Sequence, residues 1–322
     1  MTESVASGEL ERQYAFVTER AGHAALALSV LRVEGSDRTK WLHKLITADV
    51  EHLAAGQGVR SALLEAKGHF VADFVVLGLE DSFLLLAEPE AAGTLLQNLQ
   101  RYIIREKVRL TEESGRWTGW TVVGRQANDF VLKEFGAQVP AAPFCWNRSE
   151  VDASSIYLIH GDRARLPSVD LLVPAVASGV VSERLRVLPE IGADLLEILR
   201  VEAGLPRWGT DFDAGVLALE IPQVMSIRVD QGCYVGQEVV ARLVHRGHVN
   251  RHLVGLKFAG VLPSAGETID GPDGAVGSVT SAVASPRLGP IGLGFVRREF
   301  AAPGTELRIG QGSAQVVGLP FE

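Results

Sequence analysis

The chain has 322 residues, which exceeds the usual size of one domain, so we expect two or three domains. Apolar residues make up 47% and charged residues 22%, the balance of a globular protein with a large core. The formal net charge of -8 argues against a nucleic-acid backbone as the main partner. The first residues lack a signal-peptide pattern, and no uncharged apolar stretch reaches 18 residues. These features predict a cytoplasmic location and no membrane association.

The first third of the chain is typical of a mixed α and β unit. An apolar strand is expected before the Gly-Ser-Asp turn, where Ser36 or Asp37 can cap a following helix. That helix has an apolar stripe at helical spacing, formed by Trp41, Leu42, Leu45 and Ile46. Two apolar runs, about 70–79 and 83–87, predict a β-hairpin, and a second helix follows through "EAAGTLLQNLQRYIIREKVRL".

The rest of the chain divides into two further parts. Alternating strand-like runs with Pro and Gly interruptions, from about 117 to 187, predict a second α+β unit. The stretch "PEIGADLLEILRVEAGLPRW" predicts a helix that stops at Gly204, with Pro206 just beyond. After Arg251, short strands with closely spaced turn glycines favour a small barrel or sandwich.

Two cysteines, Cys145 and Cys233, are too few for a disulfide framework, and neither is part of a CxxC pair. Cys233 has Gly232 before it and Gly236 shortly after it, which favours a tight loop that can approach a ligand. A thiol there could be exposed and activated by a nearby cation, Arg228 or Arg242. The alternative is a buried, inert side chain.

The helix that follows Cys233 carries Gln237, Glu238 and Arg242. Glu238 and Arg242 are one turn apart, so they could form a surface ion pair. The alternative is that these polar residues lie beside the thiol and take part in a site. The nearby histidines, His245, His248 and His252, lack the partners and spacing of a metal site, and we expect no metal.

Glu202 lies in the last turn of its predicted helix, where the helix dipole disfavours a negative charge. If buried, it needs a donor. A pterin or guanine edge offers two parallel N–H donors to a carboxylate, whereas Arg200 or Arg207 would form a salt bridge. No nucleotide-binding loop and no hydrolase motif is present.

The stretch "QGCYVGQEVVAR" with "HRG" and Arg251 resembles the signature of the YgfZ branch of the GcvT (glycine cleavage T-protein, aminomethyltransferase) superfamily. The stretches "GSDRTKWLHKLITADV", "LEAKGHF", "RYIIREKVRL", "EAGLPRWGTDFD" and "GSVTSAVASPRLGPIGLGFV" are also similar and occur in the family's order. The resemblance therefore covers nearly the whole chain.

The resemblance implies a multi-domain, ring-like α+β fold with a C-terminal β-barrel and tetrahydrofolate held near a central opening. The implied units are 1–115, a folate-binding domain completed by 197–243, then 116–196, then the barrel 244–322. The YgfZ branch is associated with iron–sulfur enzymes, including tRNA-modifying ones. Iron–sulfur client or assembly proteins are therefore the implied partners, beside folate, without direct nucleic-acid binding.

Carried over by position, the resemblance makes Cys233 the catalytic candidate. The implied cofactor-binding residues are Glu202, Tyr234, Gln237, Glu238 and Arg242. The signature's opening lysine is Gln231 here, which removes a cation beside the thiol. The turn after the second sheet run carries Glu88 and Glu90 rather than a catalytic aspartate, so enzyme activity stays open. The alternatives to an iron–sulfur accessory protein are an aminomethyltransferase and a non-enzymatic scaffold.

Overall fold

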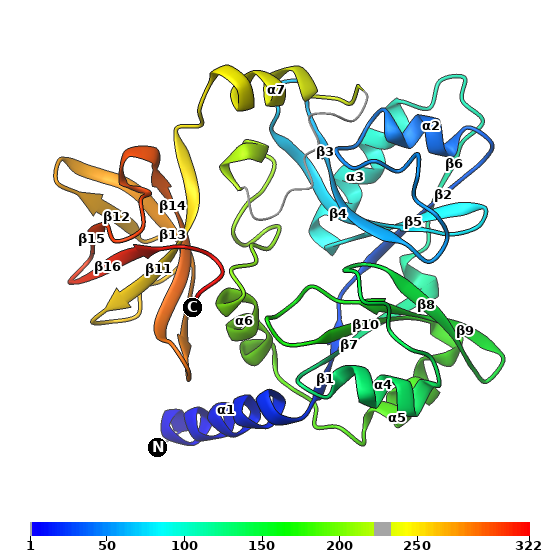
Figure 1. The fold of residues 1–322 in the computed structure, drawn as a ribbon, viewed down its shortest axis with the longest axis horizontal. Coiled ribbons are helices and arrows are strands. Elements are labelled where there is room, and N and C mark those ends of the chain that lie inside the picture. The colour runs from blue at the N-terminus through cyan, green and yellow to red at the C-terminus, as the bar shows by residue number, and fades with distance from the viewer. Residues whose placement is uncertain (1, 222–232) are drawn as a thin grey trace.

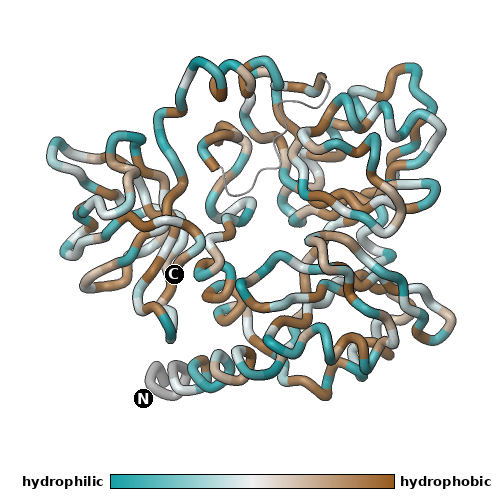
Figure 2. The backbone as a smooth tube through the Cα atoms, in the orientation of Figure 1, coloured by the Kyte–Doolittle hydropathy of each residue, from teal (hydrophilic) through white to brown (hydrophobic). Residues whose placement is uncertain are grey.

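The computed structural model describes residues 2–221 and 233–322, and within the first helix it describes the side chains from residue 8 onward. Three β assemblies make up the fold, two open five-stranded sheets and one closed barrel. Figure 1 shows the barrel on one side and the two sheets, one above the other, on the opposite side, with helix α6 between them. Apolar residues concentrate on the strands and buried helices, and the outer loops are mostly hydrophilic (Figure 2).

The first sheet is antiparallel, in the order β3-β4-β5-β2-β6. Its strands are β2 (Ser29–Glu34), β3 (Gly58–Leu64), β4 (Phe70–Gly78), β5 (Ser82–Ala87) and β6 (Arg109–Glu112). The β4–β5 pair confirms the predicted hairpin. Helices α2 (Arg38–His43) and α3 (Pro89–Arg101) belong to this unit, and Leu95 and Leu99 of α3 are fully buried. Asp37 occupies the N-cap position of α2, but its side chain makes no capping hydrogen bond.

The second sheet has the order β1-β7-β10-β9-β8. Its strands are β1 (Gly22–Leu26), β7 (Trp117–Val123), β8 (Trp146–Val151), β9 (Ser154–His160) and β10 (Ser168–Pro174), with helices α4 (Ala127–Phe135) and α5 (Ser178–Leu185). Strand β1 lies inside the stretch 1–115 that was assigned to the first unit, yet it pairs with β7. The predicted boundary is wrong at this point, because strand pairing joins segments that sequence order keeps apart.

Residues beyond Arg251 form a closed barrel in the order β11-β14-β13-β12-β15-β16, as expected. Its strands are β11 (Arg251–Ala259), β12 (Thr268–Gly271), β13 (Gly274–Ser285), β14 (Gly289–Arg297), β15 (Glu306–Ile309) and β16 (Gly312–Val317). The fold is therefore mixed α and β, with a C-terminal β-barrel. Short 3-10 turns cover Ser114–Arg116, Ala175–Ala177, Ala218–Glu220 and Arg298–Phe300.

Three further helices lie outside the two sheets and the barrel. Helix α1 (Thr2–Glu19) was not predicted, and it leads from the N-terminus into β1 (Figure 1). Helix α6 (Ala193–Glu202) ends as predicted before Gly204, which adopts φ +69°. Helix α7 (Gln237–Arg246) joins the first unit to the barrel (Figure 1). No helix in the described ranges is both long enough and apolar enough to span a bilayer.

Candidate functional site

A cavity of about 410 Å³ lies where the two open sheets meet α6 and the loop that follows it. That volume is within the usual range of small-molecule sites, roughly 300 to 1,000 Å³. Its walls combine apolar side chains with nine charged ones. The carboxylates are those of Asp73, Glu88, Asp162, Asp170 and Glu197, and the guanidinium groups are those of Arg60, Arg163, Arg200 and Arg207.

Arg60 on β3 and Asp73 on β4 form a close ion pair in the wall of the cavity. The Arg60 Nη2–Asp73 Oδ2 distance is 2.7 Å and the Nε–Oδ1 distance is 3.1 Å. Arg60 is paired with Val75 and Asp73 with Ala62 in the strand register, so the two charged side chains are diagonal neighbours on one face. Burial disfavours the charged guanidinium, but the adjacent Asp73 carboxylate outweighs burial, and the pKa of Arg60 is raised. The Arg60 guanidinium therefore remains charged.

A second ion pair joins Arg163, in the loop after β9, to Asp170 on β10 of the second sheet. Arg163 Nε donates to Asp170 Oδ1 at 2.7 Å and to Oδ2 at 2.9 Å. Burial opposes the charge on Arg163, yet Asp170 more than compensates, and the pKa of Arg163 is raised. The pair neutralises a cation that would otherwise face the ligand space.

The α6 wall is held by Arg200, which donates to Glu197 Oε2 at 3.0 Å and to Asp211 Oδ2 at 2.6 Å. Arg207 Nη1 lies 3.4 Å from the same oxygen, Oε2 of Glu197. All four guanidinium groups of the cavity are thus within reach of a carboxylate. The cavity consequently offers little free positive charge for a phosphate.

Glu88 and Asp162 lack the side-chain partners that the other charged groups of the cavity have, and of these two Glu88 is half-buried whereas Asp162 is exposed. Glu88 is at the N-cap position of α3 and makes no side-chain cap, and its carboxylate has no hydrogen-bond or ion-pair partner within residues 2–221 and 233–322. Burial raises the pKa of Glu88, assisted by the carboxylates of Glu90 and Asp73 and opposed by Arg163 and Arg207. A raised pKa means that the ionised form is poorly stabilised, so a ligand that supplies N–H donors would relieve this cost.

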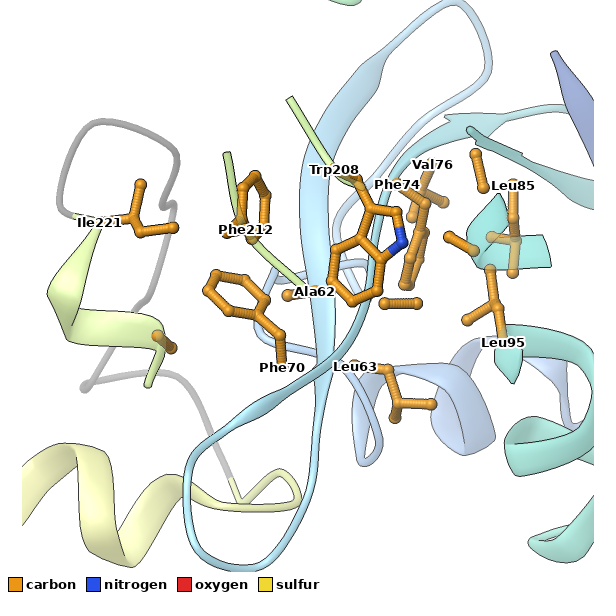
Figure 3. Packing of buried hydrophobic residues seen from close by; sticks show 14 of the residues in the cluster. Ala62, Leu63, Phe70, Phe74, Val76, Leu85, Leu95, Trp208, Phe212 and Ile221 are labelled. Carbon is orange, nitrogen blue, oxygen red and sulfur yellow. The ribbon is translucent and has the colours of Figure 1, made fainter. Parts of the chain in front are cut away.

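One wall of the cavity is aromatic. Trp208 lines the cavity and packs edge-on against Phe212, with ring centroids 5.4 Å apart. Phe70 of β4 packs behind them, 4.9 Å from the Phe212 ring, and Phe74 lies beside Trp208 (Figure 3). The loop after α6 is therefore fixed to the first sheet by an apolar cluster, and Trp208 of that cluster also lines the cavity.

Glu202, which we expect to bind a pterin ring, does not line this cavity. Helix α6 presents Ala193, Leu196, Glu197 and Arg200 to the cavity, a spacing of three or four residues. Glu202 is two residues beyond Arg200, which places it roughly 200° around the helix at 100° per residue. Its buried carboxylate accepts hydrogen bonds from Tyr14 on α1, at 3.0 Å, and from Ser285 of the barrel. Burial and Glu202 together raise the pKa of Tyr14 to about 12.

Glu202 therefore joins three elements, α1, α6 and β13, and its donors come from the protein itself. Arg287 lies 4.0 Å from its carboxylate, whereas the two arginines expected as partners, Arg200 and Arg207, pair with other carboxylates. A role for Glu202 in holding a ligand stays a prediction without support from the position of its side chain.

Cys233 is exposed, and it does not line the cavity. The segment from Tyr234 into α7 packs against the tip of the β3–β4 hairpin, where a Cβ on Gly236 would come within 2.6 Å of the Glu65 carbonyl oxygen. Gly236 also has φ +86°, so a glycine is required at this turn. The hairpin tip is roughly 13 Å along β3 from Arg60, at 3.3 Å per residue.

The other predicted site residues of this segment, like Cys233, do not line the cavity. Tyr234 is buried, and burial raises its pKa to about 12, while Glu238 and Arg242 are exposed on α7 and Gln237 is half-buried. Their roles stay predictions, and Arg228, Gln231 and Gly232 lie outside the described residues. In the described part of the chain, no group of three His, Cys, Asp or Glu side chains is arranged to hold a metal ion.

Sequence reasoning missed Asp73, Arg60 and the other charged residues of the cavity. The detectable signal was a charged residue inside each apolar strand pattern, Arg60 in "GVRSALL" and Asp73 in "FVADFVVLG". A charge in a buried strand needs a partner or a function. Glu88 was noted at the right turn but was not assigned to a site.

Comparisons with known proteins agree with this architecture. Residues 9–156 match the GCVT N-terminal domain, and residues 251–321 match the glycine cleavage T-protein C-terminal barrel domain. The chain is 28% identical over 344 residues to an aminomethyltransferase of Cutibacterium acnes, covering 98% of this chain and 90% of that protein. It is 27% identical over 313 residues to the mitochondrial aminomethyltransferase of Gallus gallus, covering 90% and 78%.

A solved structure, the glycine cleavage system aminomethyltransferase T from Bartonella henselae, has the same fold. The TM-score is 0.87 at 21% sequence identity, over 97% of this chain and 89% of that one. The two domain matches occur in order and together span more than half of the chain. The chain belongs to the GcvT superfamily, whose N-terminal domain and C-terminal barrel it carries.

Proposed function

We propose that the chain binds a reduced folate, tetrahydrofolate, in the cavity between the two open sheets. The observation that carries this proposal is Glu88, a carboxylate without a partner among the described residues, in a cavity whose guanidinium groups are all near carboxylates. The pterin ring offers an N–H beside an exocyclic amine, which match two carboxylate oxygens. Trp208 supplies an apolar face for such a ring.

The proposal predicts a selective effect of Glu88 on folate affinity. Wild-type protein titrated calorimetrically with tetrahydrofolate, under anaerobic conditions, should bind with micromolar affinity or better, about -8 kcal/mol. Glu88→Gln should weaken binding by about tenfold or more, because one charge-assisted acceptor contributes on the order of 1.5 to 3 kcal/mol.

The matched control is Glu90→Gln, which makes the same change two residues along the chain at an exposed position outside the cavity. Its affinity should equal that of wild type. Folate affinity is also measured for Glu202→Gln, which distinguishes the two candidate acids. It should stay unchanged, since Glu202 is hydrogen-bonded to Tyr14 and Ser285. Absence of binding, or loss of affinity in Glu202→Gln but not in Glu88→Gln, would refute this assignment.

Within this proposal, the chain serves as an accessory protein for iron–sulfur enzymes, as in the YgfZ branch. Two observations support this choice. The thiol of the branch signature, Cys233, is exposed and available to a partner. The Asp73 carboxylate in the cavity is held by two N–H groups of Arg60, so it is a poor general base for one-carbon transfer.

We expect cells that carry only Cys233→Ala to lose iron–sulfur enzyme activity several-fold, while the abundance and folding of the variant stay normal. Cys145→Ala is the control, because Cys145 is the other cysteine of the chain. Enzyme activities equal to wild type in the Cys233→Ala strain would contradict the accessory role without affecting folate binding.

Aminomethyl transfer remains the second candidate. It is favoured by the position of Asp73 in the cavity and by the names of the relatives. Turnover of an aminomethyl donor in the presence of tetrahydrofolate, abolished in Asp73→Asn, would establish it. A scaffold without a ligand would show neither turnover nor folate binding.

A further inference from the structure

Exposed cations and an exposed isoleucine occur together on α2, α3 and the connection from α3 to β6. We call this group the basic face. It consists of Lys40 and Lys44 at the end of α2, Arg101 at the end of α3, and Ile104, Arg105 and Lys107 in the connection to β6. Ile104 is 81% exposed, which is unusual for a large aliphatic side chain.

The parts of the basic face are held together by the fold. Trp41 Nε1 of α2 donates to the Tyr102 carbonyl oxygen at 3.0 Å, and the Lys107 N–H donates to Asp37 Oδ2 at 2.7 Å. The Glu106 carboxylate accepts the N–H groups of Ile104 and Arg105, each at 2.9 Å. These backbone hydrogen bonds, with a further contribution from Lys44, lower the pKa of Glu106. These hydrogen bonds therefore fix the conformation of the loop that carries Ile104.

The charge of the basic face opposes that of the whole molecule. Its five cations have no carboxylate within ion-pair distance in the described parts of the chain, and Glu106 is the acid beside them. The chain as a whole has a net charge of -8. Elsewhere arginines such as Arg32, Arg109 and Arg116 are paired with acids. A local excess of positive charge on an acidic protein attracts acidic partners, and the basic faces of two copies of the chain repel each other.

We propose that the basic face is a docking site for an acidic protein, with Ile104 entering an apolar recess of that partner and the five cations contacting its carboxylates. An aliphatic centre with a charged rim is the usual anatomy of a protein interface. A nucleic-acid backbone would match the cations but would leave Ile104 against phosphate and sugar.

The basic face leaves the cavity accessible. The sheet order β3-β4-β5-β2-β6 places β6 at one edge, while the cavity is lined from β3, β4 and β5. Three strand spacings of about 4.8 Å separate β4 from β6. A docked protein and a ligand can therefore be bound together, and failure of folate binding would leave this docking site intact.

Site-specific photo-crosslinking tests the proposal. The full-length chain carrying benzoylphenylalanine at position 104, produced in cells of the source organism, should give one dominant crosslinked protein. Position 261 is the matched control, because Val261 lies on the barrel and is 83% exposed. The crosslinked protein is then identified and purified as the binding probe.

Binding of that purified probe should weaken about tenfold in a Lys44→Glu/Arg105→Glu double variant and in Ile104→Asp. The loss caused by the charge reversal should shrink between 0.1 and 0.5 M salt, where screening is stronger, as estimated from the Debye length. A Lys257→Glu/Arg308→Glu variant, which makes the same charge change on exposed barrel positions, should bind like wild type.

Three outcomes would overturn the proposal. One is equal crosslinking at positions 104 and 261, and another is equal binding of the probe by all variants. The third is that the basic-face variants alter binding of a labelled RNA oligonucleotide or self-association in sedimentation, which would assign the face to nucleic acid or to a second copy of the chain.

Discussion

Asp211→Ala is expected to lower the free energy of unfolding by about 3 to 5 kcal/mol, the usual cost of removing one partner of a buried ion pair. The Asp211 side chain is fully buried. It accepts hydrogen bonds from Arg200 at 2.6 Å, from Thr280 at 2.5 Å and from Ser281 at 2.7 Å. It also accepts the backbone N–H of Arg207 at 2.9 Å. Removing this carboxylate leaves several donors unsatisfied between α6 and the barrel.

Urea denaturation followed by tryptophan fluorescence measures the effect. Asp213→Ala is the control, since Asp213 lies on the same loop but is exposed, and it should stay within about 0.5 kcal/mol of wild type. The conservative Asp211→Asn variant keeps the volume of the side chain but not its charge. Its loss of unfolding free energy should lie between those of Asp213→Ala and Asp211→Ala. A loss below about 1 kcal/mol in Asp211→Ala would mean that the lobes are held by other contacts.

Phe70→Ala is expected to destabilise the protein by about 3 to 5 kcal/mol, the range measured for aromatic truncation in packed cores. Phe70 has no exposed surface and contacts both Trp208 and Phe212, with centroids 6.3 and 4.9 Å away (Figure 3). The cavity left behind would lie under the loop that supplies the aromatic wall of the ligand site. Folate affinity should therefore fall together with stability.

Phe70→Leu, which keeps much of the volume, should cost roughly 1 to 1.5 kcal/mol and preserve folate binding. Both variants are compared by thermal and urea unfolding, with calorimetric titration at a temperature where each is folded. Equal stability of the alanine and leucine variants would show that the site relaxes around the missing ring, contrary to the rigid packing described above.

Local patterns in the chain were enough to predict much of the fold. The hairpin β4–β5 follows from two apolar runs around a polar turn, and the end of α6 follows from Gly204 and Pro206. The barrel follows from short strands between turn glycines. In each case neighbouring residues contain the whole signal, because turn formation and strand alternation depend on near neighbours.

The candidate site could not be predicted in the same way. The resemblance drew attention to Cys233, Glu238 and Glu202, but the cavity is lined instead by Asp73, Glu88 and the cations around them. These residues come from two sheets, from α6 and from loops beside them, and the tertiary arrangement of those elements decides which of them meet. Even the pairing of Arg60 with Asp73 depends on the β3–β4 register, since a shift by one residue would turn one of them to the opposite face.

By itself, the sequence determined the superfamily, the type of most elements and the need for a donor beside a buried Glu202. The tertiary structure decided that this donor is Tyr14 of an unpredicted helix, together with Ser285 of the barrel. It also decided that Glu88 is the half-buried carboxylate of the described cavity that has no side-chain partner, beside the exposed Asp162. The physical reason is that a charged group is satisfied by whatever donor is close in space, and those donors are up to 188 residues away along the chain.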